Sequence, residues 1–403
     1  MRALESKSHP ILACPLMALT ILQVIPSLDA GGAERTTIDI AGAITVAGGK
    51  ALVASQGGRL EDELAAMGGE LIRLPVASKN PLTILANAGK LEKIIRERNV
   101  SVIHARSRAP AWSAFFAART TKIPFVTTYH GAYNARNWFK KQYNGIMAAG
   151  AMVIANSQFT GDEIAKTYGT NKKRIAVIPR GTDFSAFDKS KITLERVLEM
   201  KARWGLAGYR GPVLLLPARL TRWKGHLVFI EALSQLKREG RLGEATAVLA
   251  GDAQGREAFL EEVKLAIQAG GLETRVKIVG HIEDMPAAYA ASALVVSAST
   301  DPEAFGRAIV EASAMGVPVI ATDHGGARET LIGEPRDQIT GWLAPPGDAK
   351  ALAEAISAAL ALSPQERTEI GARGSLYVRR RYSREAMCRA TLQVYLRVID
   401  GQI

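Results

Sequence analysis

Residues 293–329 constrain the fold most strongly, because two short apolar runs flank a helical pattern there. The first run, Ala293–Val296, opens into a polar loop that ends at Phe305 and Gly306. Apolar residues then recur at helical spacing, and a second apolar run, Val317–Ile320, follows. Buried parallel strands have near-continuous apolar sequences. The stretch therefore predicts a strand, a helix and a second strand within a parallel α/β sheet.

Both predicted strands open into loops that carry glycines and acidic residues. Glu303 lies in the first loop, and the second loop is Asp323-His324-Gly325-Gly326. The carboxyl ends of parallel strands meet at one edge of a sheet, which is where open α/β sheets bind ligands. Glycines let backbone amides approach a ligand, and a helix N-terminus suits phosphate or sugar hydroxyls. We therefore expect a ligand site at this edge.

Glu311 lies about a turn and a half into the predicted helix, among residues that we expect to be buried. A buried carboxylate needs a partner, and the two vicinal hydroxyls of a ribose would serve. The other interpretation stays open at this point. In that interpretation Glu303 is a solvated loop acid and Glu311 pairs with a nearby arginine.

These residues resemble the signature of retaining glycosyltransferases of family 4, which have the GT-B fold. Glu303 and Glu311 stand at the E-x7-E spacing, with Phe305-Gly306 between them and Gly325-Gly326 beyond. Further motifs follow the family's order from about Thr20 to about Tyr395. The resemblance implies that Glu303 lies near the donor sugar and that Glu311 holds the nucleotide ribose. It also implies that backbone amides around Ala304, Phe305 and Gly306 bind sugar hydroxyls.

The length of 403 residues predicts two domains with ample cores. The resemblance implies an α/β, GT-B architecture of two Rossmann-like, doubly wound domains that face each other across a cleft. We place an acceptor-binding domain at residues 1–190, with residues 1–18 as a loose extension, and a nucleotide-sugar-binding domain at residues 191–383. The final helix, within residues 384–403, would pack back on the first domain.

Composition excludes several classes of protein. Cys14 and Cys388 give neither a metal-ligand spacing nor a disulfide framework, which fits a reducing, cytoplasmic setting. Residues Ile11–Cys14 loosely resemble a lipoprotein cleavage site, but the apolar core is short and Thr20–Ile25 is needed as the first strand. No apolar run reaches the roughly 18 residues of a transmembrane helix.

The net charge of +12 is unevenly distributed along the chain. Residues 1–187 hold 23 Lys and Arg against 13 Asp and Glu, whereas residues 188–403 hold 28 against 26. Such a basic excess fits nucleic acid, an anionic membrane surface or an acidic acceptor. No nucleic-acid-binding motif is present, so we expect no nucleic-acid partner.

Three loops of the first domain carry candidate ligand-binding residues. Gly31 and Gly32 start a predicted helix, where they form either a platform for phosphate or hydroxyl groups or a plain tight turn. The resemblance implies that this loop approaches the donor's phosphates and the acceptor. Arg106 and Arg108 lie in a basic loop on the ligand side, after the predicted strand Ser101–His104, and are candidates for binding the acceptor or a membrane surface.

His130 follows the predicted strand Pro124–Tyr129. A histidine at a strand end is often a hydrogen-bonded loop residue. The resemblance implies that it contacts the donor sugar and the reacting region, and we assign that role to His130 rather than to His104. The sequence departs from the family at Arg180, because an asparagine more often precedes the glycine that is Gly181 here.

Residues 134–143 interleave aromatic and basic side chains, among them Trp138, Lys140 and Lys141. Two interpretations are open. The segment is either an ordinary helix whose aromatic side chains pack inward, or an interfacial helix that meets anionic lipid headgroups or an acidic acceptor.

Arg219 and Lys224 flank a short loop at the end of the predicted strand Pro212–Pro217. Such a pair suits a pyrophosphate, although a solvated basic loop is the other interpretation. The resemblance implies that the two cations neutralise the departing diphosphate without a metal ion, which agrees with the absence of a D-x-D triplet. It also implies that the nucleotide base lies against the backbone near Ile282, after the predicted strand Val276–Gly280.

Together with these observations, the family resemblance implies a retaining glycosyltransferase that needs no cofactor or metal. We expect it to move a hexose of mannose or glucose type from a nucleotide-diphosphate sugar to an envelope glycan or glycolipid, such as a lipopolysaccharide core. The residues expected to act in catalysis are His130, Arg219, Lys224 and Glu303. A nucleotide-sugar epimerase or hydrolase of the same fold, and a non-catalytic sugar-binding protein, remain as alternatives. We expect a cytoplasmic protein that binds peripherally to the inner face of the membrane.

Overall fold

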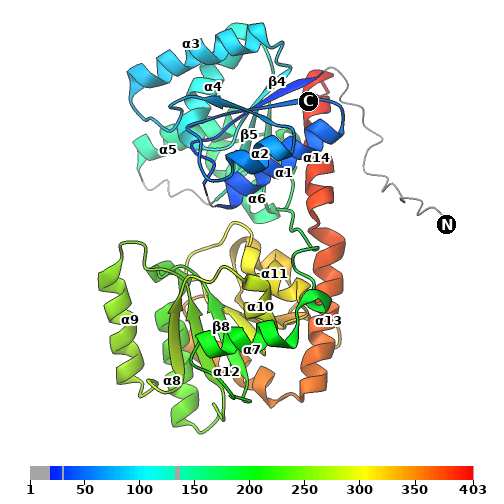
Figure 1. Cartoon of the computed structure of the whole chain (residues 1–403). Helices are drawn as coiled ribbons and strands as arrows, with labels where there is room; N and C mark the ends of the chain where they lie inside the picture. Colours follow the sequence, from blue (N-terminus) through cyan, green and yellow to red (C-terminus); the bar gives the residue numbers. More distant parts are fainter. Residues whose placement is uncertain (1–18, 30, 132–136, 403) are drawn as a thin grey trace, which may run out of the picture. The chain divides into compact units, whose positions relative to one another are not determined.

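The computed structural model describes residues 19–29, 31–131 and 137–402. The chain divides into two compact units (Figure 1). Unit 1 runs to Gly181 and resumes at Arg384, and unit 2 is Thr182–Ser383. The prediction that concerns residues 1–18 lies outside the described residues.

Unit 1 contains a parallel sheet of seven strands in the order β3-β2-β1-β4-β5-β6-β7. Because the chain moves outward in one direction from β1 and then restarts beside β1 with β4, the switch point lies between these two strands. The strands are β1 (Thr20–Val24), β2 (Lys50–Ser55), β3 (Glu70–Arg73), β4 (Val102–Ala105), β5 (Phe125–Tyr129), β6 (Met152–Ala155) and β7 (Ile175–Val177).

Helices cover both faces of this sheet. Alternate strand residues point to opposite faces, so Ile21 belongs to one hydrophobic cluster and Leu22 to another. The first cluster includes residues of α1 (Gly32–Val46), α2 (Glu61–Ala66) and α14 (Arg384–Ile399). The second includes residues of α3 (Pro81–Glu97), α4 (Arg108–Thr121) and α6 (Gln158–Tyr168), and α5 (Trp138–Gly145) follows the segment outside the described residues.

Unit 2 repeats the plan with a parallel sheet of six strands in the order β10-β9-β8-β11-β12-β13. Its switch point lies between β8 and β11. The strands are β8 (Val213–Pro217), β9 (Thr246–Ala250), β10 (Val276–Gly280), β11 (Leu294–Ser297), β12 (Val319–Thr322) and β13 (Gly341–Ala344).

The two faces of the second sheet are also covered. One cluster joins the sheet to α8 (His226–Arg238), α9 (Glu257–Ala269) and α12 (Ala349–Ala361). The other joins it to α7 (Leu194–Arg203), α10 (Met285–Ala290) and α11 (Arg307–Ala314). A third, smaller cluster packs α13 (Pro364–Arg381) against α11. Both sheets are therefore doubly wound, and the predicted α/β class is confirmed.

The division between the units falls after Gly181, whereas the sequence led us to place a domain boundary at 190. Residues just past Gly181 are held by unit 2. The Thr182 amide donates to the Tyr382 carbonyl at 2.8 Å, and Phe184 and Phe187 pack against the cluster that contains Phe305. These contacts are far apart in sequence, so composition alone does not reveal them.

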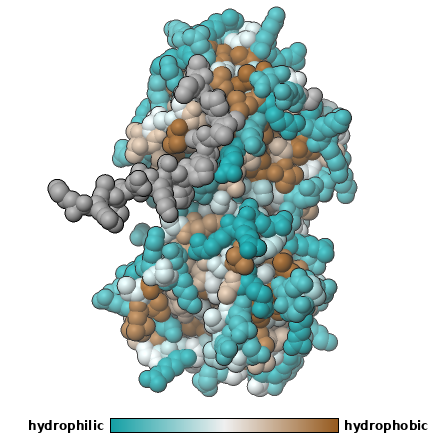
Figure 2. Space-filling model, turned by 90° about the vertical axis from the view of Figure 1, so that its right-hand side faces the viewer, coloured by the Kyte–Doolittle hydropathy of each residue, from teal (hydrophilic) through white to brown (hydrophobic). Residues whose placement is uncertain are grey.

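The surface is ordinary for a globular chain. On the face that Figure 2 shows, hydrophilic side chains predominate and hydrophobic ones occur in separate patches. Among the described residues, no helix is long and apolar enough to span a membrane.

Candidate functional site

Three loops meet at the carboxyl edge of the sheet in unit 2, beside the switch point between β8 and β11. The loop after β8 contains Arg219 and Lys224, and the loop after β11 contains Glu303. The loop after β12 contains Gly325 and Gly326. This edge is where doubly wound sheets bind their ligands.

Two glycines allow these loops to touch. Gly225 has φ = 74°, and a Cβ placed there would lie 1.8 Å from the Ala298 carbonyl oxygen. Gly325 has φ = 64°, and a Cβ there would lie 2.6 Å from the Glu303 carbonyl oxygen. That same oxygen accepts a hydrogen bond from the Gly326 amide at 2.7 Å. Any side chain at either position would force the loops apart.

Lys224 and Glu303 form an ion pair, with Nζ of Lys224 2.7 Å from Oε1 of Glu303. Their side chains are only 18% and 13% exposed, so Glu303 is not a solvated loop acid. The Ser299 hydroxyl also donates to Glu303. Burial favours the neutral acid, but the Lys224 charge and these hydrogen bonds outweigh it and hold the pKa of Glu303 below its ordinary value. Glu303 is therefore a fixed, ionised carboxylate.

Arg219 is exposed at the same edge. Its side chain has no hydrogen bond or ion pair within residues 19–29, 31–131 and 137–402, in contrast to Arg222 three residues later, which pairs with Glu262. A cation without a protein partner can bind an anionic ligand at no cost in broken contacts. Arg219 and Lys224 thus give this edge two cations, of which Lys224 contacts the Glu303 carboxylate.

Glu311 is buried in α11, where it accepts a hydrogen bond from the Tyr289 hydroxyl at 2.9 Å and pairs with Arg307 at 2.9 Å. Burial raises its pKa, and Arg307 and Tyr289 oppose that rise. The alternative in which Glu311 pairs with a nearby arginine thus describes the structure. Binding of a ribose stays a prediction, and it would require Arg307, which is 55% exposed, to share the carboxylate.

The Phe305-Gly306 pair begins α11. Phe305 is 4% exposed and packs edge-on against Tyr382, with ring centroids 5.3 Å apart. Gly306 has φ = 87° and caps the helix without a side-chain hydrogen bond. The predicted role of Ala304, Phe305 and Gly306 therefore rests on backbone amides, because the Phe305 ring belongs to the core. Ile282 is half-buried and follows β10 at the same sheet edge.

Sequence reasoning missed the residues that fix the two glutamates. Ser299 and Tyr289 hold Glu303 and Glu311, respectively. Ser299 could have been suspected, because it is a polar residue in the same loop four positions before Glu303. Tyr289 gave no signal, since it lies on α10 in an ordinary helical pattern.

A second group of predicted residues gathers at the carboxyl edge of the sheet in unit 1. Arg106 follows β4, His130 follows β5, and Gly31 and Gly32 start α1. Arg180 links two of these elements. Its Nη2 donates to the His130 carbonyl at 3.3 Å, and its Nη1 lies 2.2 Å from where a Cβ on Gly32 would be. Gly32 therefore leaves space for the Arg180 guanidinium.

His104 is a buried histidine whose two ring nitrogens both have hydrogen-bond partners. Its Nδ1 lies 2.7 Å from the Tyr395 hydroxyl on α14, and its Nε2 lies 2.7 Å from the Thr128 hydroxyl. Burial, together with the nearby charge of Arg106, lowers the pKa of His104. Both ring nitrogens of His104 thus have partners, and the role assigned to His130 stays a prediction.

Arg106 lies in the predicted basic loop after β4, but it is buried. Only 2% of it is exposed, and its guanidinium donates to the Thr36 hydroxyl on α1. Arg108, in contrast, is half-buried at the start of α4 and donates to the Asn144 side chain at 3.0 Å. Packing of α1 over the sheet encloses the first arginine and not the second.

The aromatic side chains of α5 point two ways. Trp138 and Phe139 are 65% and 77% exposed, with ring centroids 4.9 Å apart, and Lys140 and Lys141 beside them are also exposed. Only Tyr143 packs inward, stacked on Trp112. The interpretation in which the aromatic residues face the core therefore holds for Tyr143 alone. Residues 134–136 of this predicted segment lie outside the described residues.

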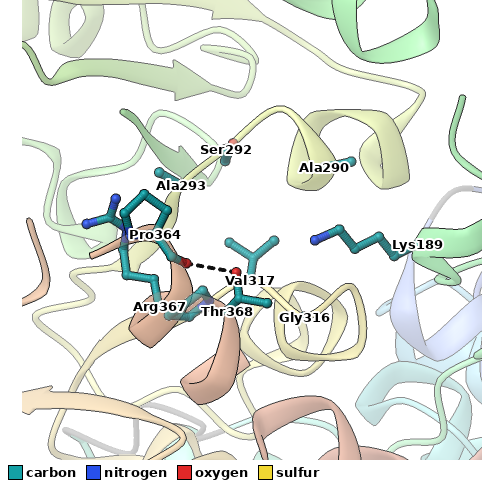
Figure 3. A pocket seen from close by; sticks show the side chains of 10 residues that line it. Lys189, Ala290, Ser292, Ala293, Gly316, Val317, Pro364, Arg367 and Thr368 are labelled. Atoms are coloured by element: carbon teal, nitrogen blue, oxygen red, sulfur yellow. Dashed lines mark hydrogen bonds between the residues drawn. The ribbon is translucent and has the colours of Figure 1, made fainter. Parts of the chain in front are cut away.

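A separate pocket of about 210 Å³ lies at the opposite edge of the sheet in unit 2. Figure 3 shows Lys189 pointing toward Val317 there, and Thr368 donating to the Pro364 carbonyl. Residues just before β11 and β12 line it, at the amino ends of the strands. Arg367 is occupied by the carbonyls of Ala359, Leu360 and Leu362. This pocket is therefore apart from the candidate site. Among the described residues, no group of three or more His, Cys, Asp or Glu could hold a metal ion.

Comparison with known proteins gives two family matches. Residues 30–186 match the model of Glycosyltransferase Family 4, and residues 211–361 match the model described as Glycosyl transferases group 1. Together the two matches cover most of unit 1 and most of unit 2.

Two curated relatives match over most of their length. D-inositol 3-phosphate glycosyltransferase of Xylanimonas cellulosilytica is 27% identical over 310 residues, which are 73% of this chain and 71% of that protein. A GDP-mannose-dependent alpha-(1-6)-phosphatidylinositol monomannoside mannosyltransferase of Mycolicibacterium smegmatis is 27% identical over 326 residues, which are 78% of this chain and 80% of that protein.

Solved structures match even more completely. A glycosyltransferase from Rickettsia africae has a TM-score of 0.84 and 37% identity, and the match covers 95% of this chain and 99% of that chain. The Anabaena protein HepE in complex with UDP-glucose has a TM-score of 0.78 and 26% identity, and covers 95% of this chain and 100% of that chain.

Proposed function

This chain belongs to glycosyltransferase family 4 and has the GT-B fold, and on that premise we propose that it is a retaining hexosyltransferase. The donor would be a nucleotide-diphosphate sugar bound mainly by unit 2. The acceptor would be an envelope glycan or glycolipid bound mainly by unit 1. The observation that carries the proposal is the ion pair between Lys224 and Glu303 beside the exposed Arg219.

The two cations would act on the leaving group. When the bond between the anomeric carbon and the diphosphate breaks, negative charge accumulates on the departing oxygen. Arg219 can bind diphosphate oxygens with its planar guanidinium, and Lys224 supplies a fixed point charge. Such preorganised charges stabilise the transition state more than the ground state, and each is worth a few kcal/mol of barrier. This role needs no metal ion.

Glu303 would keep Lys224 in position and bind a hydroxyl of the donor sugar. Its ionised carboxylate already accepts from Lys224 and Ser299, so a sugar hydroxyl would add one more donor. Backbone amides at the start of α11 would bind further hydroxyls. Glu311 would accept hydrogen bonds from the nucleotide ribose, as the family resemblance implies.

The transfer would retain the anomeric configuration. The acceptor hydroxyl would attack the anomeric carbon from the side of the departing diphosphate, and its proton would pass to a phosphate oxygen as the new C–O bond forms. His130 would contact the sugar near the reacting carbon. The diphosphate leaves with the electron pair of the broken bond and takes up the acceptor proton, so no covalent sugar–enzyme intermediate is needed.

The donor class is supported by the similarity to HepE, whose structure contains UDP-glucose. The Mycolicibacterium relative is named as GDP-mannose-dependent, so we propose a hexose of glucose or mannose type on UDP or GDP. The acceptor class is supported by that relative's name, which specifies a phosphatidylinositol monomannoside. A lipopolysaccharide core is a second acceptor of the same general kind.

We further propose a cytoplasmic location with peripheral attachment to the inner face of the membrane. The exposed Trp138 and Phe139 beside Lys140 and Lys141 support this, because aromatic and basic side chains favour an anionic lipid interface. Residues 101–150 contain seven Lys and Arg and no Asp or Glu.

A panel of nucleotide sugars tests the function. The full chain is melted with UDP-glucose, UDP-galactose and GDP-mannose, and a donor that raises Tm is then supplied with membrane extract for transfer assays. We expect one donor to raise Tm in the wild type and in the control Lys264→Ala on α9, but not in Lys224→Ala. Equal stabilisation of Lys224→Ala would remove this edge from donor binding.

A further inference from the structure

A small cavity lies at the carboxyl edge of the sheet in unit 1, close to the switch point between β1 and β4. Its volume is about 20 Å³, enough for one water-sized group. Its polar lining among the described residues comes from six elements of unit 1 and comprises Thr36, Arg106, Thr128, His130, Asn156, Arg180 and Thr391. Within residues 19–29, 31–131 and 137–402, no acidic side chain belongs to the lining.

Arg106 brings a buried charge to this cavity. It is 2% exposed and forms no ion pair among the residues described. Asp39 and Glu34 act on it only through space. Burial lowers the pKa of Arg106 to about 10, so it stays charged at neutral pH. A buried cation without a bonded anion is costly, and proteins normally provide one.

Part of the Arg106 guanidinium lacks a hydrogen bond. One end donates to the Thr36 hydroxyl, which itself donates to the carbonyls of Gly32 and Ala33. The Nε atom is buried and has no hydrogen-bond acceptor within the described ranges. A buried donor without an acceptor is destabilising, and a ligand oxygen could supply the missing acceptor.

His130 presents a second donor. Arg180 approaches its Nδ1 at 3.4 Å, and a guanidinium can only donate, so Nδ1 must be the unprotonated nitrogen. Burial, with Arg106 and Arg180 nearby, lowers the pKa of His130, so the ring is neutral and carries its hydrogen on Nε2. Nε2 is buried and has no acceptor in the part of the chain that the structure describes.

We propose that this cavity is the anchor of an oxyanion site that recognises an anionic group, a phosphate or a carboxylate, on the acceptor. The lining offers two donors without an acceptor, the Arg106 Nε and the His130 Nε2, beside the Arg180 guanidinium, and the described part of it includes no carboxylate. The volume admits one oxygen of the anion, between Arg106 and His130. The remainder of the group lies beside the half-buried Arg180. The acceptor is therefore a phosphorylated or acidic glycan or glycolipid.

The assignment of the anionic group to the acceptor rests on the proposed function. The presence of an oxyanion site rests on the residues of unit 1 alone. An oxyanion could also come from the diphosphate of the donor. The acceptor is favoured because Arg219 and Lys224 in unit 2 already supply the two cations that a diphosphate needs.

Inorganic phosphate tests the site directly. Its affinity for the full chain is measured by titration calorimetry in the presence of saturating UDP or GDP, whichever nucleotide binds, with chloride at equal ionic strength as the blank. We expect phosphate to bind the wild type, and to bind Arg180→Gln at least tenfold more weakly. The matched control is Arg119→Gln, an exposed arginine on α4. Circular dichroism verifies that both variants are folded.

Each result decides the assignment. Equal phosphate affinity in Arg180→Gln and Arg119→Gln would overturn the site. Loss of phosphate binding in the presence of nucleotide would assign the oxyanion to the donor and also overturn the proposal. Phosphate binding that depends on Arg180 in a protein that binds no nucleotide sugar would instead refute the proposed function and leave the anion site standing.

A pair of acceptors tests the link to catalysis. Glucose and glucose 6-phosphate differ only in the anionic group, and transfer to each is measured at equal concentrations. We expect the wild type to prefer the phosphorylated sugar, and Arg180→Gln to lose that preference through a higher KM at similar kcat. A preference that survives in Arg180→Gln would contradict recognition of the acceptor by this residue.

Discussion

The Nζ atom of Lys224 lies 2.7 Å from Oε1 of Glu303, although 79 positions separate the two residues. The contact exists because Gly225 lets the loop after β8 pack on the Ala298 carbonyl of the loop after β11. It fixes an ammonium group at the carboxyl edge of the sheet in unit 2. That edge therefore has a preorganised cation and an ionised carboxylate before any ligand arrives.

Replacing Lys224 or Arg219 by alanine should reduce turnover by roughly 100-fold or more if, as proposed, each cation stabilises charge on the departing phosphate. The fold should survive, since both residues lie on a loop. Arg222→Ala is the control, because Arg222 lies in the same loop but pairs with Glu262. Steady-state kinetics with the chosen donor gives the comparison. Near-wild-type activity in Lys224→Ala would exclude that residue from the mechanism.

Transfer should persist in excess EDTA, and the product should keep the anomeric configuration of the donor. Both follow if Arg219 and Lys224, rather than a divalent ion, neutralise the diphosphate. Activity after dialysis against chelator and NMR of the anomeric proton measure the two properties. An absolute metal requirement or an inverted product would contradict the proposed mechanism.

Local sequence patterns predicted the regular elements well. The strand Val276–Gly280 has the expected bounds, the predicted strand Pro124–Tyr129 agrees with β5 to within one residue, and the final helix, Arg384–Ile399, lies within the expected residues 384–403. Such elements depend on short-range features, namely apolar runs, helical spacing and glycine stops. The predicted glycines and acids at the strand ends also lie at the carboxyl edges of the sheets, because residues that directly follow parallel strands are all at that edge.

Long-range contacts could not be predicted from the same patterns. The sequence predicted Arg106 in a basic loop, but it did not indicate that Arg106 is buried and donates to Thr36, which lies 70 positions away. His104 forms a hydrogen bond with Tyr395, which lies 291 positions later in the sequence. Whether a charged side chain is exposed, paired or buried depends on which helix packs over the strand end, and helix packing is a property of the assembled sheet. Burial and pairing of candidate site residues therefore required the structure.

Gly225→Ala should destabilise the chain far more than Gly240→Ala. Both glycines have positive φ, 74° and 68°, so both substitutions incur left-handed strain of about 1–2 kcal/mol. Only at Gly225 does the new Cβ also collide with a carbonyl oxygen, whereas nothing lies within 4 Å at Gly240. Urea unfolding of the two variants measures the difference. Equal losses would mean that the loop after β8 can shift freely.

Stability should fall as pH drops below 6.5, in part because of His226. This side chain is fully buried in α8, and burial lowers its pKa to about 4. The unfolded chain takes up the proton near pH 6.5 and the folded chain does not until about pH 4, so stability is present above pH 6.5 and is lost as pH falls through that window. The loss between pH 7 and 5 is about 2 kcal/mol for this residue.

Urea unfolding at pH 7 and pH 5 measures this loss, with His226→Leu as the test variant. His281, which is exposed, provides the control His281→Leu. We expect a smaller pH dependence in His226→Leu than in the wild type or the control. Identical slopes in all three proteins would assign the acid sensitivity to other groups, such as His104 and His130, whose pKa values burial also lowers.

The full chain should bind vesicles that contain anionic lipid more tightly than neutral vesicles. Trp138 and Phe139 expose their rings beside Lys140 and Lys141, and each basic residue near an anionic surface contributes about 1 kcal/mol. Binding should weaken as salt rises, because the screening length falls to about 10 Å at 0.1 M.

Replacing Lys140 and Lys141 by Glu should release the protein and leave donor binding intact, since the donor site is assigned to unit 2. The matched control replaces Lys172 and Lys173, an exposed pair in unit 1 without neighbouring exposed rings, by Glu. Equal flotation of the two double variants would show that net charge, rather than the aromatic and basic face of α5, drives any attachment.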